Sequence, residues 1–307
     1  MYNVFIDGSA GTTGLKIIDR LSDRKDIKLI TLPEELRKDT LARKDALNSS
    51  DVAFLCLPDA AAIEAVSLVE NQKVKIIDTS TAHRTNDAWQ YGFAEINDFD
   101  KKIAQSNRIA NPGCHASGFI ALVNPLINAG VLSENAKLTC FSLTGYTGGG
   151  KKMIAEYEGE EKPVLYDAPR QYGLTQKHKH LPEMQKYCKL NNAPIFCPIV
   201  ADFDRGMEVT VPLFKEDINC DIDGLKEIFM KAYEGSKVVK FTQTDEGGFL
   251  SANLMKGKDS LEISVFGNEE RIILVSRFDN LGKGASGAAI QNMNILLGVE
   301  QTTGLIL

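Results

Sequence analysis

The sequence predicts an α/β protein of two domains, a doubly wound parallel sheet followed by an α+β domain with a mixed or antiparallel sheet. Three observations support this prediction. Short apolar segments alternate with amphipathic ones through the first hundred residues, a glycine-rich turn follows the first of them, and alternating apolar and polar residues dominate several later segments. The first pattern is typical of βαβ units, and the last is typical of antiparallel strands.

The elements of the first domain follow in a regular order. Residues 1–6 predict a short apolar strand, and an amphipathic helix follows the glycine turn at 8–14. Later elements repeat the alternation, with strands expected at 27–32, 52–57 and 73–78 and a helix expected at 59–70. Strands joined by helical crossovers lie parallel, so this domain is expected to be Rossmann-like.

The second domain has a different sequence pattern, in which apolar and polar residues alternate. Its candidate strands lie at 137–144, 195–200, 207–214 and 261–266, and an apolar helical run ends near Leu297. We therefore expect a nucleotide-binding domain over 1–114, completed by a C-terminal helix over 284–307, and a catalytic and oligomerisation domain over 115–283. Small residues before the final helix permit close packing, so this helix is expected to return to the first domain near the cofactor.

The glycine turn is the first candidate binding site. Its pattern is GxxGxxG, which departs from the GxGxxG fingerprint, but a strand precedes it and a helix follows it, as a pyrophosphate site requires. We predict that a dinucleotide contacts Gly8, Ser9, Ala10, Gly11, Thr12, Thr13 and Gly14, the alternative being a tight turn without a ligand. Arg37 and Lys38 after the second strand favour NADP(H) over NAD. Glu34 and Glu35 beside them keep a solvated charged loop as an alternative.

Cys114 is the candidate nucleophile. A Pro-Gly turn leads into it, and the apolar segment 119–123 predicts a helix directly after it. A cysteine at a helix N-terminus is favoured as a thiolate by the macrodipole and the free N–H groups. The alternative is a buried structural thiol. A thiolate beside a nicotinamide would attack a carbonyl or an acyl phosphate, giving an adduct that exchanges hydride.

Other segments offer partners for this chemistry. His178 and His180 are candidate acid–base groups because imidazole titrates near neutral pH, although a solvated basic loop would look the same. The loop at 145–152 has a composition suited to a phosphate, and Arg84 after the fourth strand is a candidate anion clamp or a structural ion pair. No CxxC pair occurs and no typical zinc spacing surrounds the two histidines, so we expect no metal.

Composition excludes several classes of protein. The chain has 307 residues, 43% of them hydrophobic, and a net charge of −6 with no long basic block. We therefore expect no nucleic-acid partner. The six cysteines lack the dense spacing of a secreted disulfide scaffold, and no segment has the length and apolar character of a signal peptide or membrane span. A cytoplasmic protein with reduced thiols and no membrane partner is expected.

Taken together, these motifs resemble the shorter class of N-acetyl-gamma-glutamyl-phosphate reductases, over nearly the whole chain. The resemblance is carried by segments 7–14, 55–59, 78–84, 91–95, 111–114, 142–152, 178–183 and 278–292. It implies NADPH-dependent reduction of N-acetyl-gamma-glutamyl phosphate, an acyl phosphate, to N-acetylglutamate 5-semialdehyde in arginine biosynthesis. It also implies a fold shared with aspartate-semialdehyde dehydrogenase and a homo-oligomer, dimer or tetramer.

The resemblance also implies roles for individual residues. Cys114 matches the nucleophile and His178 matches an active-site histidine, with His180 and Glu183 as its neighbours, although spacing alone does not separate the two histidines. These four residues are the candidate catalytic residues. Further cofactor contacts are implied at Pro58, Ser80, Asn280 and Gly284, and substrate contacts at Arg84, Asn111, Tyr146, Gly148 and Lys151. One departure is the segment 115–117, where such enzymes often have an aromatic residue, a proline and a threonine.

Two other functions stay open at this point. An aspartate-semialdehyde dehydrogenase would use the same chemistry on a shorter substrate without the N-acetyl group. A non-catalytic NADP-binding redox sensor would use Cys114 only to report oxidation. The hydroxyl-rich loop, Arg84 and the histidine pair argue against the sensor, which needs none of them.

Overall fold

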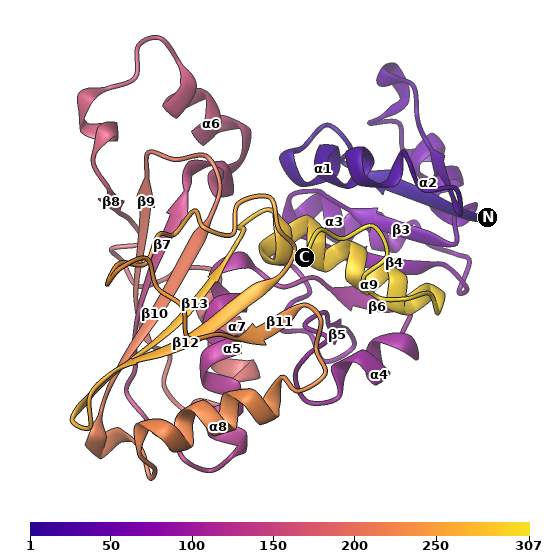
Figure 1. Ribbon diagram of the computed structural model, residues 1–307. Coiled ribbons are helices and arrows are strands. Elements are labelled where there is room, and N and C mark those ends of the chain that lie inside the picture. The colour runs from indigo at the N-terminus through magenta and orange to yellow at the C-terminus, as the bar shows by residue number, and fades with distance from the viewer. The chain divides into compact units, whose positions relative to one another are not determined.

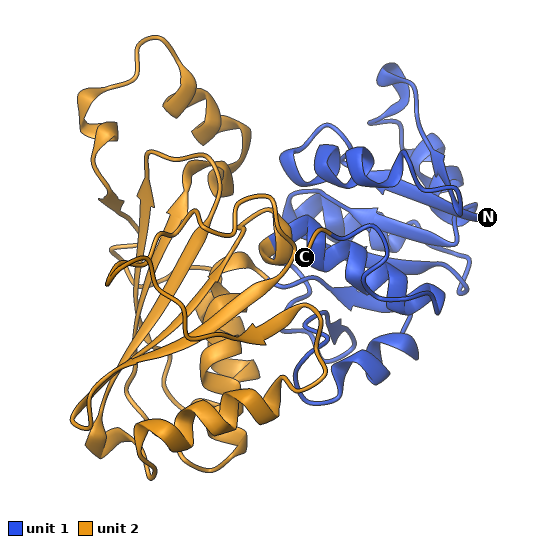
Figure 2. Cartoon of the chain, viewed as in Figure 1, with its two compact units in different colours: residues 1–112, 285–305 blue, residues 113–284, 306–307 orange.

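The computed structural model describes residues 1–307 and divides them into two compact units (Figure 2). Unit 1 comprises Met1–Pro112 and Ala285–Leu305, and unit 2 comprises Gly113–Gly284 and Ile306–Leu307. No helix in the structure combines the length and apolar character needed to cross a membrane.

Unit 1 is a six-stranded sheet in the order β2-β1-β3-β4-β6-β5, with every neighbouring pair parallel (Figure 1). Its strands are β1 (Tyr2–Asp7), β2 (Ile27–Ile30), β3 (Val52–Leu55), β4 (Lys75–Asp78), β5 (Gln90–Tyr91) and β6 (Arg108–Ala110). Its helices are α1 (Thr12–Leu21), α2 (Thr40–Asn48), α3 (Asp59–Ser67), α4 (Phe99–Ala104) and α9 (Gly287–Leu297). The strand order reverses beside β1, so the predicted doubly wound parallel sheet is confirmed.

The two faces of this sheet bury different side chains because alternate residues of a strand point to opposite faces. Val4, Phe54 and Ile77 share a core with residues of α1 and α9. Phe5 and Leu55 share another core with residues of α2 and α3. The near-continuous apolar strands of the sequence are therefore explained by helices on both faces of the sheet.

The last helix is shorter than the sequence predicts. The helix expected over 284–307 occupies only Gly287–Leu297, after a π-helical turn at Gly282–Ser286, so the prediction of its extent is wrong. Gly298 takes a left-handed conformation, with φ of 68°, and ends the helix. The remaining residues form turns, a bend and irregular chain.

Unit 2 is a seven-stranded mixed sheet in the order β11-β12-β13-β10-β7-β9-β8 (Figure 1). Its strands are β7 (Thr139–Gly145), β8 (Arg170–Gln171), β9 (Ile195–Ala201), β10 (Met207–Phe214), β11 (Val239–Phe241), β12 (Leu261–Gly267) and β13 (Arg271–Phe278). β7 and β9 pair in parallel, as do β11 and β12, while the other pairs are antiparallel. The predicted mixed α+β domain is confirmed.

Helix α5 (Cys114–Asn128) packs on this sheet and carries the candidate nucleophile at its first residue. The close approach of α5 to the sheet depends on Gly118, because a Cβ at this position would lie 2.4 Å from Val209 of β10 and 2.8 Å from Phe278 of β13. The other helices are α6 (Gly150–Glu158), α7 (Leu181–Tyr187) and α8 (Ile222–Ala232). Unit 2 therefore holds the start of α5 against its own sheet.

Candidate active site

The predicted position of Cys114 at a helix N-terminus is confirmed. Gly113 is the extended N-cap residue of α5, and Cys114 is its first helical residue, half-buried. The Gly113 N–H donates a 3.0 Å hydrogen bond to Oε2 of Glu183, a carboxylate with 1% of its surface exposed. Glu183, expected among the catalytic residues as a neighbour of His178, thus binds the turn that presents the cysteine.

The residue after the nucleophile is the centre of a buried polar cluster that the sequence reasoning missed. His115 Nδ1 lies 2.6 Å from Oγ of Ser142 on β7, and its Nε2 lies 2.7 Å from the hydroxyl of Tyr172. Burial lowers the pKa of His115 to about 3, so its imidazole is neutral. Burial first, and then the charge of Cys114, raise the pKa of the Tyr172 hydroxyl. Only the alternation along 137–144, which buries Ser142, hinted at this arrangement.

The two predicted histidines lie beside this cluster. The ring centroids of His178 and His180 are 4.8 Å apart, and they lie 5.7 and 5.4 Å from that of His115. One ring nitrogen of His180, one of His115 and Sγ of Cys114 all lie within 4.8 Å of one another. The structure therefore brings the predicted nucleophile and the predicted histidine segment together within unit 2.

The loop expected to bind phosphate forms a 3-10 turn at Tyr146–Gly149 that continues into α6. The Tyr146 hydroxyl donates to Glu158 at 3.0 Å, and its ring stacks on Tyr157 at 4.9 Å. Burial, with the Glu158 contact, raises the pKa of Tyr146 to about 12. Gly148 and Lys151 are exposed.

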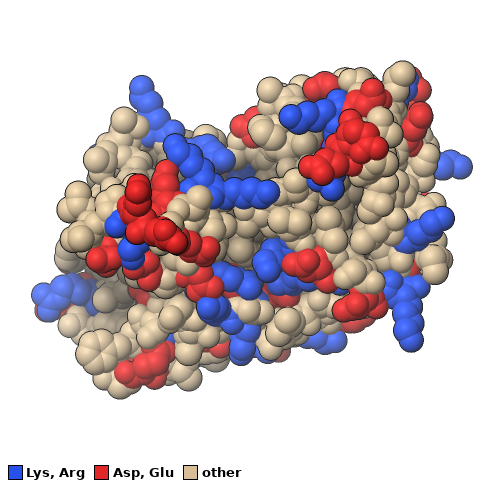
Figure 3. Space-filling model, turned by 90° about the horizontal axis from the view of Figure 1, so that it is seen from above, with Lys and Arg blue, Asp and Glu red and all other residues tan.

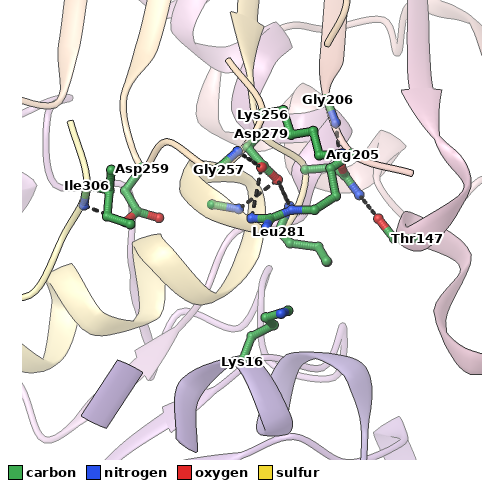
Figure 4. A network of polar contacts seen from close by, with 12 residues as sticks. Lys16, Thr147, Arg205, Gly206, Lys256, Gly257, Asp259, Asp279, Leu281 and Ile306 are labelled. Carbon is green, nitrogen blue, oxygen red and sulfur yellow. Dashed lines mark hydrogen bonds and ion pairs between the residues drawn. The ribbon is translucent and has the colours of Figure 1, made fainter. Parts of the chain in front are cut away.

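Two residues expected to contact cofactor lie after β13 in unit 2. Asn280 accepts from the Gly206 N–H at 2.9 Å and donates to Thr147 at 3.0 Å. Next to it, the buried carboxylate of Asp279 accepts from Arg205, Gly257 and Leu281, as Figure 4 shows. This network holds the turn that leads to Gly284.

Gly284 lies against the nucleophile itself. A Cβ at this position would lie 3.0 Å from Cβ of Cys114 and 3.1 Å from the Asp279 carbonyl oxygen. Both contacts are tighter than a side chain normally makes. Glycine at 284 therefore leaves room for Cys114.

In unit 1 the glycine turn opens into a cavity of about 860 Å³. Of the predicted cofactor residues, Gly8, Ser9, Ala10, Arg37 and Lys38 line it, whereas Gly11, Thr12, Thr13, Gly14 and Pro58 are not among its lining residues. Pro58 is instead the N-cap residue of α3. The cavity thus joins the first glycine of the turn to the basic pair after β2.

The backbone of the turn explains its glycines. Gly8 has φ of +83°, and a Cβ there would lie 2.2 Å from the Cys56 carbonyl oxygen. A Cβ on Gly14 would lie 2.6 Å from the Gly8 carbonyl oxygen. Gly11 is the N-cap of α1 and has no side chain to bond the first N–H groups of that helix. This end of α1 is therefore suited to an anion.

An ion pair that the sequence did not reveal also borders the cavity. Asp7 at the end of β1 is 3% exposed, and its carboxylate lies 3.0 Å from Nη2 of Arg43 on α2. Arg43 also contacts Glu64 at 3.3 Å. Burial is the main reason that the pKa of Asp7 is raised, and Arg43 opposes it.

The remaining predicted residues lie at the carboxyl edge of the unit 1 sheet. Ser80 donates to the buried Asp78 at 2.8 Å, and Nη2 of Arg84 donates to the Thr79 carbonyl at 2.9 Å. Asp78 also lies 2.6 Å from Nδ1 of His83. Ser80 and Arg84 are both 7% exposed, so these contacts order the loop after β4.

Asn111 belongs to a second buried network at this edge. Its Nδ2 donates to the Ala285 carbonyl at 3.1 Å, and its Oδ1 accepts from Asn292 of α9 at 3.1 Å. Asn292 also donates to the Gly92 carbonyl at 3.0 Å. The network attaches α9 to the strands of unit 1.

Charged side chains are interspersed on the surface. On the face drawn in Figure 3, Lys and Arg side chains alternate with Asp and Glu over much of the view. The net charge of −6 is therefore not concentrated in one area of that face.

Comparison with known proteins agrees with this architecture. The semialdehyde dehydrogenase NAD binding domain matches residues 33–106, and the semialdehyde dehydrogenase dimerisation domain matches 114–280. Unit 1 therefore contains a domain of a nicotinamide-cofactor-binding family. Among solved structures, aspartate semialdehyde dehydrogenase II of Vibrio cholerae superposes with a TM-score of 0.73 at 17% identity, covering 97% of this chain and 98% of that one. This likeness shows the fold.

Two curated relatives are much closer in sequence. An N-acetyl-gamma-glutamyl-phosphate reductase of Sinorhizobium medicae is 45% identical over 304 residues, covering 96% of this chain and 98% of the relative. N-acetyl-gamma-glutamyl-phosphate reductase 2 of a Nostoc species is 44% identical over 317 residues, covering 98% of each. On this full-length identity, the chain belongs to the N-acetyl-gamma-glutamyl-phosphate reductase family, within the semialdehyde dehydrogenases.

Proposed function

We propose that this protein reduces N-acetyl-gamma-glutamyl phosphate to N-acetylglutamate 5-semialdehyde and phosphate, with NADPH, in arginine biosynthesis. One observation carries the proposal: a half-buried cysteine begins α5 beside an imidazole cluster, in a chain 45% identical to such a reductase over nearly its full length. The positive end of the α5 dipole stabilises an anion on the sulfur.

The proposed reaction begins at Cys114. Its thiolate bonds to the acyl carbon while the bond from that carbon to the phosphate oxygen breaks, leaving a thioester and inorganic phosphate. NADPH, when bound, supplies a hydride to the thioester carbonyl carbon. The C–S bond then breaks as the aldehyde C=O reforms, and the sulfur keeps the electron pair.

A histidine of the 178–180 pair supplies the proton that the departing sulfur takes up. We assign this role to His180 rather than to His178, which the resemblance favoured, because a ring nitrogen of His180 lies within 4.8 Å of Sγ of Cys114. Glu183 positions the nucleophile, because its carboxylate binds the N–H of Gly113, the residue directly before Cys114. Arg84, Asn111, Tyr146, Gly148 and Lys151 are proposed to contact substrate.

The cofactor is proposed to be NADP(H). Arg37 and Lys38 line the unit 1 cavity and offer cations to a 2′-phosphate, while Gly8 to Gly14 and the start of α1 suit the pyrophosphate. Pro58, Ser80, Asn280 and Gly284 are proposed as further cofactor contacts. The cavity also fits the group by size, because about 860 Å³ lies within the range of small-molecule sites.

The protein is also proposed to be a homo-oligomer. One face of the unit 2 sheet exposes apolar side chains from four strands, at Phe141, Ile195, Phe214 and Ile273. Apolar area of this kind is typical of subunit interfaces. Sedimentation of the Phe141→Asp variant tests the proposed oligomer. The mass of the assembly is expected to be lower than that of the parent protein, and an unchanged mass would contradict the proposal.

The test of the function is phosphate-dependent reduction of NADP by N-acetylglutamate semialdehyde, with aspartate semialdehyde as competitor. Turnover of the acetylated aldehyde, with little inhibition by the shorter one, is expected. A preference for aspartate semialdehyde would move the assignment to the sister activity. Binding of NADP without turnover of either aldehyde would favour a redox sensor.

A further inference from the structure

The nucleophile lies within a cluster of three metal-binding donors. Sγ of Cys114 and one ring nitrogen each of His115 and His180 lie within 4.8 Å of one another. Thiolate and imidazole are the ligands that Zn²⁺ prefers, with bonds of about 2.0 to 2.3 Å. Ligand atoms around such an ion lie about 3.5 Å apart. Small side-chain rotations would therefore close the cluster around one ion.

The ring of His115 is already oriented for this role. Ser142, which is fully buried, holds Nδ1 at 2.6 Å. Metal-bound histidines typically have such a hydrogen bond at the second nitrogen, because it fixes the ring and the tautomer. The other nitrogen, Nε2, contacts only the hydroxyl of Tyr172, a half-buried side chain whose rotation would free it for a metal.

The elements that carry the three donors are held together by a hydrogen bond between a side chain and the backbone. Cys114 and His115 are the first two residues of α5, and His180 is the N-cap residue of α7. Glu183 in the first turn of α7 binds the Gly113 N–H, so the starts of the two helices are linked next to the cluster. His115 and His180 are 3% and 5% exposed, whereas Cys114 is half-buried, so an ion would enter from the sulfur side.

We propose that Cys114, His115 and His180 form a binding site for a borderline-soft divalent cation, with Zn²⁺ as the preferred ion. The thiol releases its proton as the S–metal bond forms, two neutral imidazoles complete a three-ligand set, and water takes the fourth position. The consequence rests on the proposed function: a sulfur bound to metal cannot attack an acyl phosphate, so Zn²⁺ is a reversible inhibitor.

Binding is tested without substrate, so a failure of the proposed function leaves the result interpretable. The chelator-treated full-length protein is titrated with Co²⁺, and thiolate-to-cobalt absorption is recorded before Zn²⁺ is added as competitor. One Co²⁺ per chain is expected, with the absorption absent from Cys114→Ser and Co²⁺ affinity at least about tenfold weaker in His115→Gln and His180→Gln.

A matched control separates this site from general metal binding. Cys220→Ser removes a half-buried thiol elsewhere, so this variant should bind Co²⁺ within about twofold of the parent protein. Absence of thiolate absorption in the parent would overturn the proposal. So would an unchanged affinity in both His115→Gln and His180→Gln variants that melt like the parent.

Discussion

The two units contain candidate sites of different construction. Most of the residues that line the unit 1 cavity come from two nearby stretches of chain, 5–10 and 29–38, and Gly8 lies in the first of them. The cluster of unit 2 consists of side chains from separate segments, with Ser142 from β7, Tyr172 after β8 and His180 before α7 meeting Cys114. The first site therefore draws mainly on residues within 40 positions of one another, whereas the second joins residues from 114 to 180.

This difference predicts different sensitivities. A backbone site fails when a side chain is added, because there is no space for a Cβ. A side-chain site fails when a group is removed or exchanged. Substitutions in each unit therefore test the contrast, and the largest effect is expected at the nucleophile.

Replacement of the nucleophile should abolish the unit 2 chemistry and leave unit 1 intact. Cys114→Ser is expected to lose about a thousandfold or more in turnover, because the serine hydroxyl is not ionised as a thiolate is. NADPH affinity, measured by fluorescence titration, should stay within about twofold of the parent. Turnover that survives in this variant would exclude the thioester route.

The imidazole pair provides the next test. If His180 donates the proton, His180→Gln should lower kcat by about a hundredfold, and His178→Gln should lower it by less. Glutamine has a volume similar to that of histidine. Differences in steady-state kinetics between the variants therefore report the loss of the acid–base group. A larger loss in His178→Gln would move the acid–base role to that residue.

A methyl group added to the unit 1 turn tests the other half of the comparison. Gly8→Ala combines a positive φ with a Cβ placed 2.2 Å from the Cys56 carbonyl, and should cost about 3 kcal/mol or more of unfolding free energy. Gly298→Ala is the matched control, since it has a φ of +68° but open space around its Cβ. This control should cost only about 1 kcal/mol. Equal losses in urea unfolding would show that crowding does not explain Gly8.

Cofactor choice should depend on the two cations of the cavity. The double variant Arg37→Ala with Lys38→Ala is expected to weaken NADPH binding about tenfold and to leave NADH binding unchanged. Lys25→Ala removes an exposed cation that does not line the cavity and serves as the control. Equal weakening for both cofactors would contradict recognition of the 2′-phosphate.

The smallest expected effect concerns Glu208 on β10, a carboxylate that belongs to neither candidate site. Burial raises the pKa of Glu208, which pairs across strands with Arg277, and Glu246 already binds that guanidinium at 2.6 Å. Because the pKa of Glu208 is raised in the folded state, this carboxyl binds more protons folded than unfolded. Its contribution to stability therefore falls as pH rises above 4.5, the ordinary pKa of a glutamate. Glu208→Gln should stabilise the protein by less than about 1 kcal/mol at pH 7 and by nothing near pH 4. Thermal melting at the two pH values measures this difference.

The sequence predicted the fold well because its strands are marked by simple periodicity. Segments 207–214 and 261–266 match β10 and β12 to within a residue, and the Pro-Gly turn correctly predicted that a helix begins at Cys114. The helix expected over 284–307 is shorter in the structure, because it ends at Leu297, where the apolar run also ends, and Gly298 then takes a left-handed conformation.

The candidate sites were predictable to different degrees for the same physical reason. The glycine turn and the Arg37–Lys38 pair are local patterns, and the structure brings Gly8 and that pair to one cavity. Ser142 and Tyr172 were not predicted because their contact with His115 depends on strand pairing across long sequence separations. The resemblance linked Cys114 with His178, whereas in the structure the ring nitrogen grouped with the Cys114 sulfur is that of His180.

The most direct test of the account is the reaction run backwards without phosphate. With N-acetylglutamate semialdehyde and NADP, the enzyme should form one NADPH per active site and then stop, because no phosphate is present to release the thioester. Intact-mass analysis should then show one N-acetylglutamyl group, and peptide mapping should locate it on Cys114. An enzyme that turns over with phosphate but gives no burst, or carries the acyl group on another residue, would contradict the account.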